Sequence, residues 1–214
     1  NLSSANKESI ICGWKFINNK LKKYKTNFIP LDSEHFSIWS LIKNSNHKMI
    51  SKIYLTASGG PFLNKSKSKI KNAKVSDVLK HPNWNMGHKI SVDSATLMNK
   101  LFELIEASKI FNLPMNKFDI IIHPKSYVHA LVNFKNGLSK ILIHDTQMEI
   151  PIFNSIFYDT SELYKKNKDI SFQNLNGKNF IKPSYSTFPI LKLIKEYKRN
   201  DSYYEIILVT VNDY

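Results

Sequence analysis

Residues 27–34 read NFIPLDSE, an apolar run that becomes acidic at Asp32. Residues 27–31 predict a short buried strand, because the run is apolar and too short for a helix. The triplet Asp32-Ser33-Glu34 directly follows the carboxyl end of that strand, which is where α/β folds place their ligands. This stretch therefore predicts an α/β fold with a polar site beside the end of a strand.

Short apolar runs predict further strands at residues 53–56, 118–122, 130–134 and 139–143. The last two are joined by Lys135-Asn136-Gly137, a turn sequence that favours a hairpin. The sequence Ser58-Gly59-Gly60 predicts a sharp turn directly after residues 53–56. Together these runs predict a sheet with at least one antiparallel pair.

Helices are predicted by apolar residues at helical spacing, at residues 8–24, 94–111 and 188–197. The clearest is 94–111, whose apolar stripe comprises Leu97, Leu101, Leu104 and Ile105. Asn99, Glu103 and Glu106 share another face of this helix, and such a polar face is usually the solvated side. Residues 65–74 predict an exposed loop or a solvated helix, and residues 206–211 a strand or a buried helix.

The composition fits a globular protein, with 214 residues of which 42% are hydrophobic. No run of about 18 apolar residues and no apolar leader occurs, so neither a membrane span nor a signal peptide is predicted. The chain begins without Met, and we therefore expect an internal piece of a longer protein. We expect a cytoplasmic location and leave a plastid open, and Cys12, the single cysteine, has no partner for an internal disulfide.

The net charge is +14, which raises the possibility of nucleic-acid binding. Arg199 is the only arginine, however, and arginine is the residue that reads guanine edges and stacks on bases. The lysines are spread along the chain, as expected for a solvated surface. We therefore expect no nucleic-acid partner, and a positive field that attracts a phosphorylated substrate.

Asp32 and Glu34 are separated by one residue, so both can reach one cation at the end of a strand. Mg²⁺ and Mn²⁺ prefer carboxylate oxygens and water, and a third carboxylate would complete such a site. Glu103 is the natural third ligand, but spacing alone does not choose between Glu103 and Glu106. A pair of acidic residues is more often a surface feature, so this prediction depends on the third ligand.

Several other segments are candidates for substrate contacts. Ser58-Gly59-Gly60 can expose backbone amides to an anion. The segment HPNWNMG at 81–87 is either a loop with an apolar anchor or a lid that closes over substrate. His129 is a candidate site residue, whereas His35 is expected to be a structural hydrogen-bonding residue.

The ordered motifs of residues 4–155 resemble those of the 1-deoxy-D-xylulose 5-phosphate reductoisomerase family. The matching segments are ANKES at 5–9, DSEH at 32–35, SGGPF at 58–62, HPNWNMG at 81–87, KISVDSATLMNK at 89–100, IHP at 122–124 with Ser126 and His129, and Met148 with Pro151. The sequence departs from the family at His88, where Arg is usual, and at Leu101, where Gly is usual. The segment between His35 and Ser58 is also short, and Val211-Asn212-Asp213 replaces Ala-Asn-Glu.

The resemblance implies an α/β chain with a mixed-sheet α+β catalytic domain. Residues 1–31 would be the last helix and strand of an NADPH-binding Rossmann domain, whose glycine-rich part is absent from the sequence. Residues 32–157 would be the catalytic domain, 158–183 a linker, and 184–214 the start of a truncated helical C-terminal domain. A homodimer is implied for the full-length protein.

The resemblance also implies roles for individual residues. Asp32, Glu34 and Glu103 would bind Mg²⁺ or Mn²⁺, with Co²⁺ as a further candidate. The implied catalytic residues are Lys7, Glu34, His81 and His129. The implied substrate contacts are Lys7, Ser33, Glu34, Ser58, His81, Ser94, Asn99, Lys100 and Glu103, with the Ser, Asn and Lys group around the phosphate. Asn6, Glu8 and Gly87 would contact NADPH, and Trp84 would belong to a lid.

The implied reaction is the metal- and NADPH-dependent conversion of 1-deoxy-D-xylulose 5-phosphate to 2-C-methyl-D-erythritol 4-phosphate, a step of non-mevalonate isoprenoid biosynthesis. We expect the 214-residue chain alone to be inactive, because half of the cofactor site is missing from it. The alternatives are a non-catalytic phosphate- and metal-binding fragment and, less favoured, a basic nucleic-acid-binding module.

Overall fold

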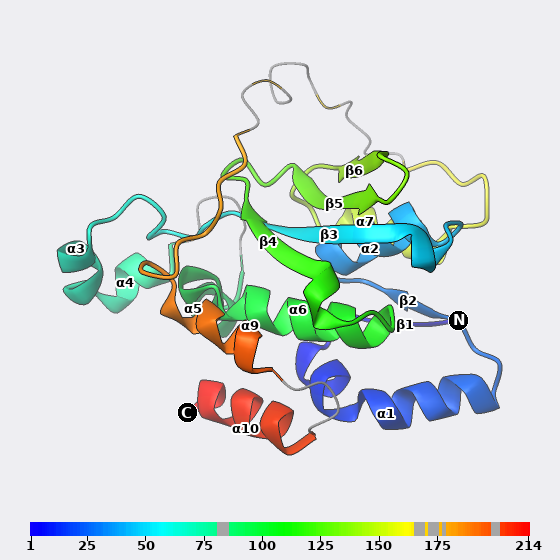
Figure 1. The fold of residues 1–214 in the computed structure, drawn as a ribbon, viewed down its shortest axis with the longest axis horizontal. Helices are drawn as coiled ribbons and strands as arrows, with labels where there is room; N and C mark the ends of the chain where they lie inside the picture. The colour runs from blue at the N-terminus through cyan, green and yellow to red at the C-terminus, as the bar shows by residue number, and fades with distance from the viewer. Residues whose placement is uncertain (81–85, 165–169, 171–175, 177–178, 198–201) are drawn as a thin grey trace.

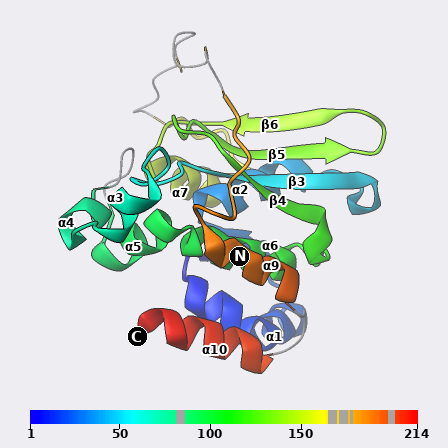
Figure 2. The same cartoon turned by 60° about the vertical axis from the view of Figure 1, so that its left-hand side comes forward.

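The computed structural model describes residues 1–80, 86–164, 170, 176, 179–197 and 202–214. Figure 1 shows a mixed sheet in the upper half of the view, helix α6 beneath it, and helices α1 and α10 below α6. The same three levels are visible after rotation in Figure 2. The mixed α/β fold predicted from the sequence is confirmed.

The elements follow in the order β1 (Leu2–Ser4), α1 (Lys7–Lys23), β2 (Phe28–Pro30), α2 (Ser33–Ile42), β3 (Ile50–Ala57), α3 (Lys67–Lys71), α4 (Val75–Val78), α5 (His88–Thr96), α6 (Met98–Ile110), β4 (Phe118–Ile122), β5 (Val128–Phe134), β6 (Ser139–Ile143), α7 (Glu149–Ile156), α9 (Leu193–Glu196) and α10 (Ser202–Asp213). Short 3₁₀ turns lie at His47–Met49, Met115–Lys117 and Pro189–Lys192.

The central sheet has the strand order β4-β3-β5-β6, with β3 and β4 parallel and the other pairs antiparallel. Alternate residues of β3, such as Ile53 and Leu55, are fully buried, as the two-residue period of a strand requires. β4 and β6 have the predicted bounds, and β3 and β5 are longer than predicted. Gly137, at a φ of 85°, closes the predicted hairpin between β5 and β6.

Helices α2 and α6 cover the sheet and form the main core with it (Figure 1). This core joins Ile38 and Ile42 of α2 to Leu104 of α6 and to the inward residues of β3 and β4. Phe188 and Leu191, from the segment before α9, complete the same cluster. Burying these side chains holds α2 and α6 at fixed positions, and both helices carry site residues.

A second core lies between α1, α6 and α10, on the side of α6 away from the sheet. Ile11 of α1, Phe102 and Ile105 of α6, and Val209 of α10 are buried in it. Leu101, which departs from the usual family pattern, is 1% exposed and packs in this cluster. The bulk of Leu101 is therefore accommodated by the helix pair on that side of α6.

The N-terminal segment forms a β-α-β unit, because β1 and β2 pair in parallel on either side of α1. The sequence predicted α1 and β2 but not β1, which has only three residues. It pairs with β2 from Leu2 with Phe28 to Ser4 with Pro30, and only Leu31 separates the end of β2 from Asp32.

The prediction of one long helix at 94–111 is wrong in one respect, because the helix is interrupted at Leu97. Leu97 has the left-handed conformation, with a φ of 63°, and it separates α5 from α6. Helical spacing continues across the break, so the pattern alone does not reveal it. The residue remains buried at 2% exposure, which anchors the bend in the core.

The described residues from Pro189 onward are mainly helical. Residues 188–197 form a 3₁₀ turn followed by α9, and residues 206–211 lie within α10, which excludes the strand alternative for them. Near the predicted linker at 158–183, the ring of Tyr158 packs on Trp39 at 5.5 Å between centroids, and Ile181 pairs with Ile122 of β4. Much of that segment lies outside the described residues.

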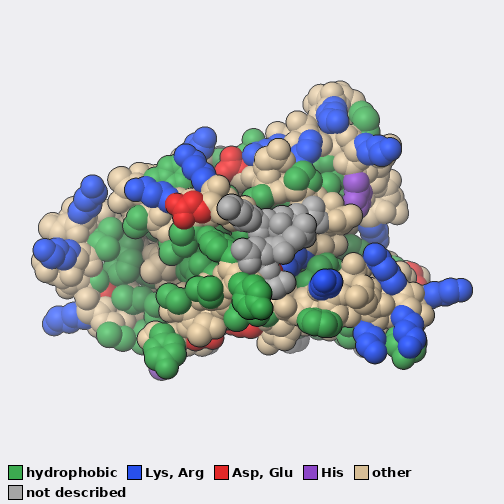
Figure 3. Space-filling view, turned by 60° about the horizontal axis from the view of Figure 1, so that its bottom comes forward, with side chains coloured by type: hydrophobic (Ala, Val, Ile, Leu, Met, Phe, Trp, Pro, Cys, Tyr) green, Lys and Arg blue, Asp and Glu red, His purple; other side chains and the backbone are tan. Residues whose placement is uncertain are grey.

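The surface carries lysines on many sides. Figure 3 shows them around the rim of one face rather than gathered into a stripe. Exposed apolar side chains also occur on α10, including Tyr203, Ile207 and Val211. Within the described part of the chain, none of the helices combines the length and the apolarity that crossing a bilayer requires.

Candidate functional site: an acidic cavity between two helices

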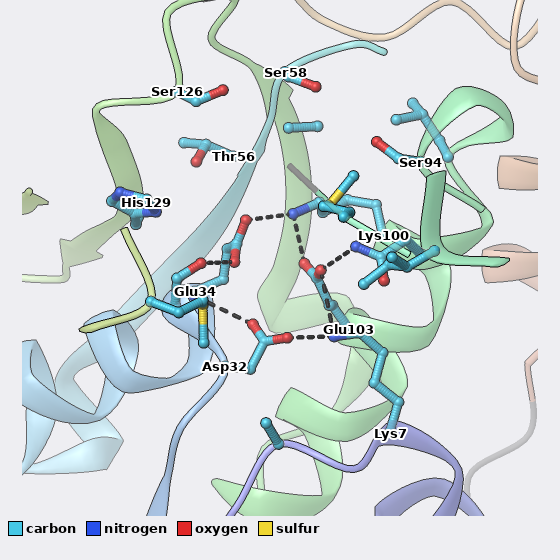
Figure 4. A pocket seen from close by; sticks show the side chains of 18 residues that line it. Lys7, Asp32, Glu34, Thr56, Ser58, Ser94, Lys100, Glu103, Ser126 and His129 are labelled. Carbon is cyan, nitrogen blue, oxygen red and sulfur yellow. Dashed lines mark hydrogen bonds and ion pairs between the residues drawn. The ribbon is translucent and has the colours of Figure 1, made fainter. Parts of the chain in front are cut away.

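A cavity of about 260 Å³ lies at the junction of the β-α-β unit, the central sheet and helices α5 and α6. Its lining comprises Ala5, Lys7, Asp32, Ser33, Glu34, Thr56, Ala57, Ser58, Met86, Ile90, Ser94, Leu97, Asn99, Lys100, Glu103, Ser126, His129 and Met148. Figure 4 shows the carboxylates and lysines together in one part of this cavity, and Ser58, Ser94 and Ser126 toward the other part.

Helix α2 positions the first two carboxylates. Asp32 is the N-cap of this helix, and its Oδ1 accepts a hydrogen bond of 3.2 Å from the backbone N–H of Glu34. The prediction that Asp32 and Glu34 share one face of a strand end is therefore corrected. Both residues belong to a helix start, where the cap and the first turn bring their carboxylates to the same side.

Helix α6 supplies the opposite wall. The break at Leu97 separates Ser94, near the end of α5, from Asn99, Lys100 and Glu103 in the first turns of α6. All four side chains still line the cavity. The bend is thus the local feature that brings residues from two helices into one site.

Two lysine ammonium groups lie between the carboxylates (Figure 4). Lys100 Nζ lies 2.6 Å from Glu34 Oε1 and 2.6 Å from Glu103 Oε2. Lys7 Nζ donates to Asp32 and lies 3.6 Å from Glu103 Oε1. Each ammonium ion therefore connects Glu103 of α6 to a carboxylate at the N-terminal end of α2. These two bridges hold the two sides of the cavity together.

The electrostatics of these groups follow from burial and proximity. Burial opposes the charge of Lys7, but the carboxylates of Asp32, Glu106 and Glu103 outweigh it and raise the pKa of Lys7 well above its usual value. The pKa of Lys100 is raised by Glu103 and Glu34 against the same penalty of burial. Both lysines are therefore fully protonated at neutral pH.

The carboxyl groups divide into two kinds. Burial would raise the pKa of Asp32, but Lys7 and His35 lower it well below the usual range, so Asp32 is ionised. Burial raises the pKa of Glu103 to about 8, with the nearby charge of Glu34 adding to the effect. Burial also raises the pKa of Glu106 to about 7. At neutral pH, Glu103 is therefore mostly protonated and Glu106 about half protonated.

The buried carboxyl groups of the site outnumber its ammonium groups. The carboxylates are Asp32, Glu34, Glu103 and Glu106, and the ammonium ions are Lys7 and Lys100. When all four carboxyls are ionised, their four negative charges and the two positive charges leave −2, which a divalent cation would neutralise. One oxygen each from Asp32, Glu34 and Glu103 lie within 4.8 Å of one another. An all-oxygen donor set of this size and charge suits Mg²⁺ or Mn²⁺.

The structure also brings Glu106 close to the same place. Asp32, His35 and Glu106 offer a second set of ligand atoms within 4.8 Å of one another. Glu106 is fully buried and does not line the cavity, whereas Glu103 does. Exposure to the cavity thus favours Glu103 over Glu106 as the third ligand, a choice that sequence spacing left open.

The turn after β3 shapes the other end of the cavity. Gly59 and Gly60 have positive φ angles of 86° and 64°, and Ser58 Oγ accepts a hydrogen bond of 3.1 Å from the backbone N–H of Gly60. A Cβ at Gly60 would lie 2.9 Å from the carbonyl oxygen of Ser94. Glycine at this position therefore lets the turn approach α5, which brings Ser58 and Ser94 to the same end (Figure 4).

Asn99 completes the polar wall. Its Nδ2 donates to Glu103 Oε1, and its Oδ1 is buried without a hydrogen-bond partner among the described residues. A buried acceptor without a partner is costly unless a ligand or water satisfies it. Asn99 therefore retains an unused acceptor next to the carboxylates of the site.

The histidines have different environments. His35 is fully buried and its Nε2 donates a 2.9 Å hydrogen bond to the carbonyl of Glu103, in line with the structural role predicted for it. His129 lines the cavity and stacks on His144, with ring centroids 3.6 Å apart. Burial, and then the proximity of His144, lower the pKa of His129 well below its usual value, so its ring is neutral at neutral pH.

The expected cofactor contacts lie beside the cavity rather than in it. The side chain of Asn6 caps α1 by accepting a 2.8 Å hydrogen bond from Ser9 N, and Glu8 pairs with Lys89 at 3.4 Å. Asn6, Glu8 and Lys89 border one surface hollow, and Gly87 is the N-cap of α5. His81 and Trp84, to which the sequence assigned site and lid roles, lie outside the described residues.

Sequence reasoning missed some of the lining. Thr56 is the last residue but one of β3, and its hydroxyl donates to the carbonyl of Val128. Ser126 was noticed only as part of a motif, yet it lines the cavity in a left-handed conformation with a φ of 56°. A polar residue at the predicted end of a strand was the available signal for Thr56.

The geometry can be compared with known proteins. Residues 28–111 match the family model for the C-terminal domain of 1-deoxy-D-xylulose 5-phosphate reductoisomerase. The 1-deoxy-D-xylulose 5-phosphate reductoisomerase of Pelagibacter ubique is 56% identical over 212 residues, which are 99% of this chain and 54% of that protein. The enzyme of that name from Sulfurihydrogenibium is 40% identical over 99% of this chain and 55% of its own length.

Solved structures agree with the sequence comparisons. A crystal structure of DOX-P reductoisomerase with NADPH, fosmidomycin and magnesium has a TM-score of 0.90 at 36% identity, covering 99% of this chain and 54% of that one. The 1-deoxy-D-xylulose 5-phosphate reductoisomerase of Zymomonas mobilis with NADPH has a TM-score of 0.81 at 32% identity, covering 91% of this chain and 50% of that one. The chain spans about half the length of the curated relatives it matches.

Proposed function

We propose that this chain, a member of the 1-deoxy-D-xylulose 5-phosphate reductoisomerase family over about half of those proteins' length, binds a divalent cation and a phosphorylated sugar in its acidic cavity. The observation that carries the proposal is the meeting of three carboxylates, Asp32, Glu34 and Glu103, within 4.8 Å. They share the cavity with serine hydroxyls at its other end (Figure 4).

The reaction proposed for the whole protein is the rearrangement and NADPH-dependent reduction of 1-deoxy-D-xylulose 5-phosphate to 2-C-methyl-D-erythritol 4-phosphate. The relatives' names support this reaction, and one solved relative holds NADPH, magnesium and fosmidomycin together. A cation bound by Asp32, Glu34 and Glu103 would supply Lewis-acid polarisation of a substrate carbonyl. Bound NADPH would supply hydride, with Asn6, Glu8 and Gly87 at one edge of its site.

The residues of the chain itself bind and orient the substrate in this proposal. Ser58, Ser94 and Asn99 supply hydrogen bonds to a phosphate. Lys100 adds a compact positive charge, although its ammonium ion lies between Glu34 and Glu103 in the present arrangement. A phosphate would therefore compete with these carboxylates for Lys100, and a bound cation would reduce their hold on it.

Three side chains are proposed to act nearer the reacting atoms. Lys7 has an ammonium ion close to Asp32 and Glu103, where it can donate to developing negative charge on a substrate oxygen. His129 Nε2 donates to the carbonyl of His144 at 3.2 Å, so the proton of the neutral ring is on Nε2. Ser33 donates to Glu34 and keeps that carboxylate in place.

We also propose the domain division 1–31, 32–157, 158–183 and 184–214, with the cavity at the junction of the first two.

A homodimer is proposed because β6 is an edge strand of the sheet among the described residues. Leu138, directly before β6, is 62% exposed and Ile141, on β6, is 45% exposed, which is unusual for an edge that stays unpaired in solution. Light scattering of the purified protein tests this, and a monomeric mass at all concentrations would contradict it.

Metal binding by site variants tests the proposed function. Electron paramagnetic resonance of Mn²⁺ should show binding by the wild-type chain. Asp32→Asn and Glu103→Gln should each weaken it by about tenfold or more, since each removes a charged ligand. Asp119→Asn is the matched control, because Asp119 lies on β4 with its side chain 40% exposed. Mn²⁺ binding that is equal in all four proteins would overturn the proposal.

A further inference from the structure

Glu106 is a buried acidic residue that the proposed chemistry leaves without a task. It lies one helical turn after Glu103 on α6 and is fully buried, yet it does not line the cavity. Neither of its carboxylate oxygens has a hydrogen-bond partner among the described residues. An ionised carboxylate that is buried without hydrogen-bond partners destabilises the fold, so we expect Glu106 to have a function that explains its presence.

The neighbours of Glu106 narrow that function. Its Oε2 lies 3.5 Å from Lys7 Nζ and 4.0 Å from His35 Nδ1. Lys7 Nζ is meanwhile held by Asp32 and lies 3.6 Å from Glu103. Glu106 thus faces an ammonium ion that is engaged elsewhere, at a distance just too long for a strong charged hydrogen bond.

The ammonium ion of Lys7 and a divalent cation would compete for the same carboxylate oxygens. The ammonium ion of Lys7 is bonded to Asp32, which belongs to the set of carboxylates that can hold the cation. A cation bound there would repel Lys7 and would withdraw Asp32 and Glu103 from it. The ammonium ion of Lys7 would then need another anion, because a buried positive charge without a partner strongly destabilises the protein.

We propose that Glu106 is a positioning residue that receives the ammonium ion of Lys7 when a divalent cation takes Asp32 and Glu103. A movement of Lys7 Nζ by about 1 Å would shorten the 3.5 Å separation to a charged hydrogen bond. The lysine stays beside the cavity after this movement, so it remains available to the substrate. Glu106 therefore favours cation binding without being a ligand itself, and this inference rests on the proposed metal site.

Glu106 differs from a metal ligand in that its effect on cation affinity depends on the presence of Lys7. The test is a double-mutant cycle of Glu106→Gln and Lys7→Met, read as Mn²⁺ affinity by electron paramagnetic resonance and not as turnover. In the wild-type background, Glu106→Gln should weaken Mn²⁺ binding about tenfold, as expected for a residue that supports a ligand sphere. In the Lys7→Met background, Glu106→Gln should change the affinity less than about twofold, because no ammonium ion needs to be received.

Two outcomes of the cycle overturn the inference. An equal loss of affinity in both backgrounds would make Glu106 a direct ligand, and no loss in either would make it a bystander. Wild-type chain that binds no Mn²⁺, or binds it independently of Asp32, would instead overturn the proposed function. Circular dichroism of each variant checks that it folds.

A second measurement needs no variant. In a crystal structure of the wild-type chain with Mn²⁺, Lys7 Nζ should lie within about 3 Å of a Glu106 oxygen, the length of a charged hydrogen bond. Lys7 still bonded to Asp32 in the Mn²⁺-bound protein would contradict the inference.

Discussion

His35 donates a hydrogen bond of 2.9 Å from Nε2 to the backbone carbonyl of Glu103, 68 residues further along the chain. The bond joins the first turn of α2 to the middle of α6. It is fully buried, and it fixes the separation of the two helices that carry the carboxylates. The geometry of the acidic cavity thus depends on a residue that does not line it.

Replacing His35 with Phe should therefore destabilise the protein. The substitution leaves the Glu103 carbonyl without its donor, which costs about 1–3 kcal/mol in the free energy of unfolding. Urea denaturation followed by circular dichroism measures this loss. His47→Phe is the control, because His47 is exposed, and its effect should stay within about 0.5 kcal/mol. Equal stability of the two variants would show that the bond to Glu103 is unimportant.

The turn at Gly60 gives a second prediction. Gly60→Ala places a Cβ 2.9 Å from a backbone oxygen at a φ of 64°, so it should cost about 1–3 kcal/mol of stability. Gly13→Ala is a matched control within α1, where nothing lies within 4 Å of the added Cβ. It should stabilise the chain by up to about 1 kcal/mol, because alanine is the better helix former. Thermal unfolding of both variants checks the opposite signs.

The pKa of Glu103 predicts how metal binding depends on pH. The folded protein holds this pKa at about 8, above the usual 4.5, so the protonated form is favoured up to that pH. A ligand must be deprotonated, and binding at pH 7 should therefore release about one proton from Glu103. The apparent Mn²⁺ affinity should rise up to tenfold per pH unit below pH 8 and level off above it.

Calorimetry in buffers of different ionisation heat measures the released proton directly. Asp119→Asn should keep the same pH dependence, since Asp119 lies away from the cavity on β4. An Mn²⁺ affinity that stays constant from pH 6 to pH 8 would show that Glu103 is not protonated before the cation binds.

The docking of α10 depends on another buried carboxylate. Glu205 is 1% exposed, accepts a hydrogen bond from the hydroxyl of Tyr197, and pairs with Lys109 of α6 at 2.7 Å. Glu205→Ala should cost about 3–5 kcal/mol, because it removes the buried carboxylate that pairs with the Lys109 ammonium ion. The exposed pair of Asp213 with Lys89 is the comparison, and Asp213→Asn should cost less than about 1 kcal/mol. Denaturant titration that ranks the two variants equally would contradict this account of α10.

The sequence predicted the strands well where a clear period and a turn agreed. Residues 118–122 and 139–143 are strands with the predicted bounds, and Asn136-Gly137 marks the hairpin. β1 was missed because three residues carry too little pattern. The break at Leu97 was missed because an apolar residue in a left-handed conformation is decided by tertiary packing and leaves no local signal.

The motifs could predict which carboxylates lie together in the acidic cavity, but not how they pair with the lysines. The motifs pointed to Asp32, Glu34 and Glu103 together, and the structure places their oxygens close to one another. The helical pattern could not show that the polar face of α6 is buried, since a solvated face has the same spacing. The pairing of Lys7 and Lys100 with the carboxylates depends on side chains that are distant in sequence.

The most direct test of the account is the metal dependence of fosmidomycin binding to this chain, measured by calorimetry with Mn²⁺ and with excess chelator. The account predicts measurable binding with Mn²⁺, weaker by about tenfold or more when the cation is removed, because the cation and the serine end of the cavity hold opposite ends of one ligand. Binding of equal strength in chelator, or no binding in either condition, would contradict the claim that this cavity holds a divalent cation and a phosphorylated substrate together.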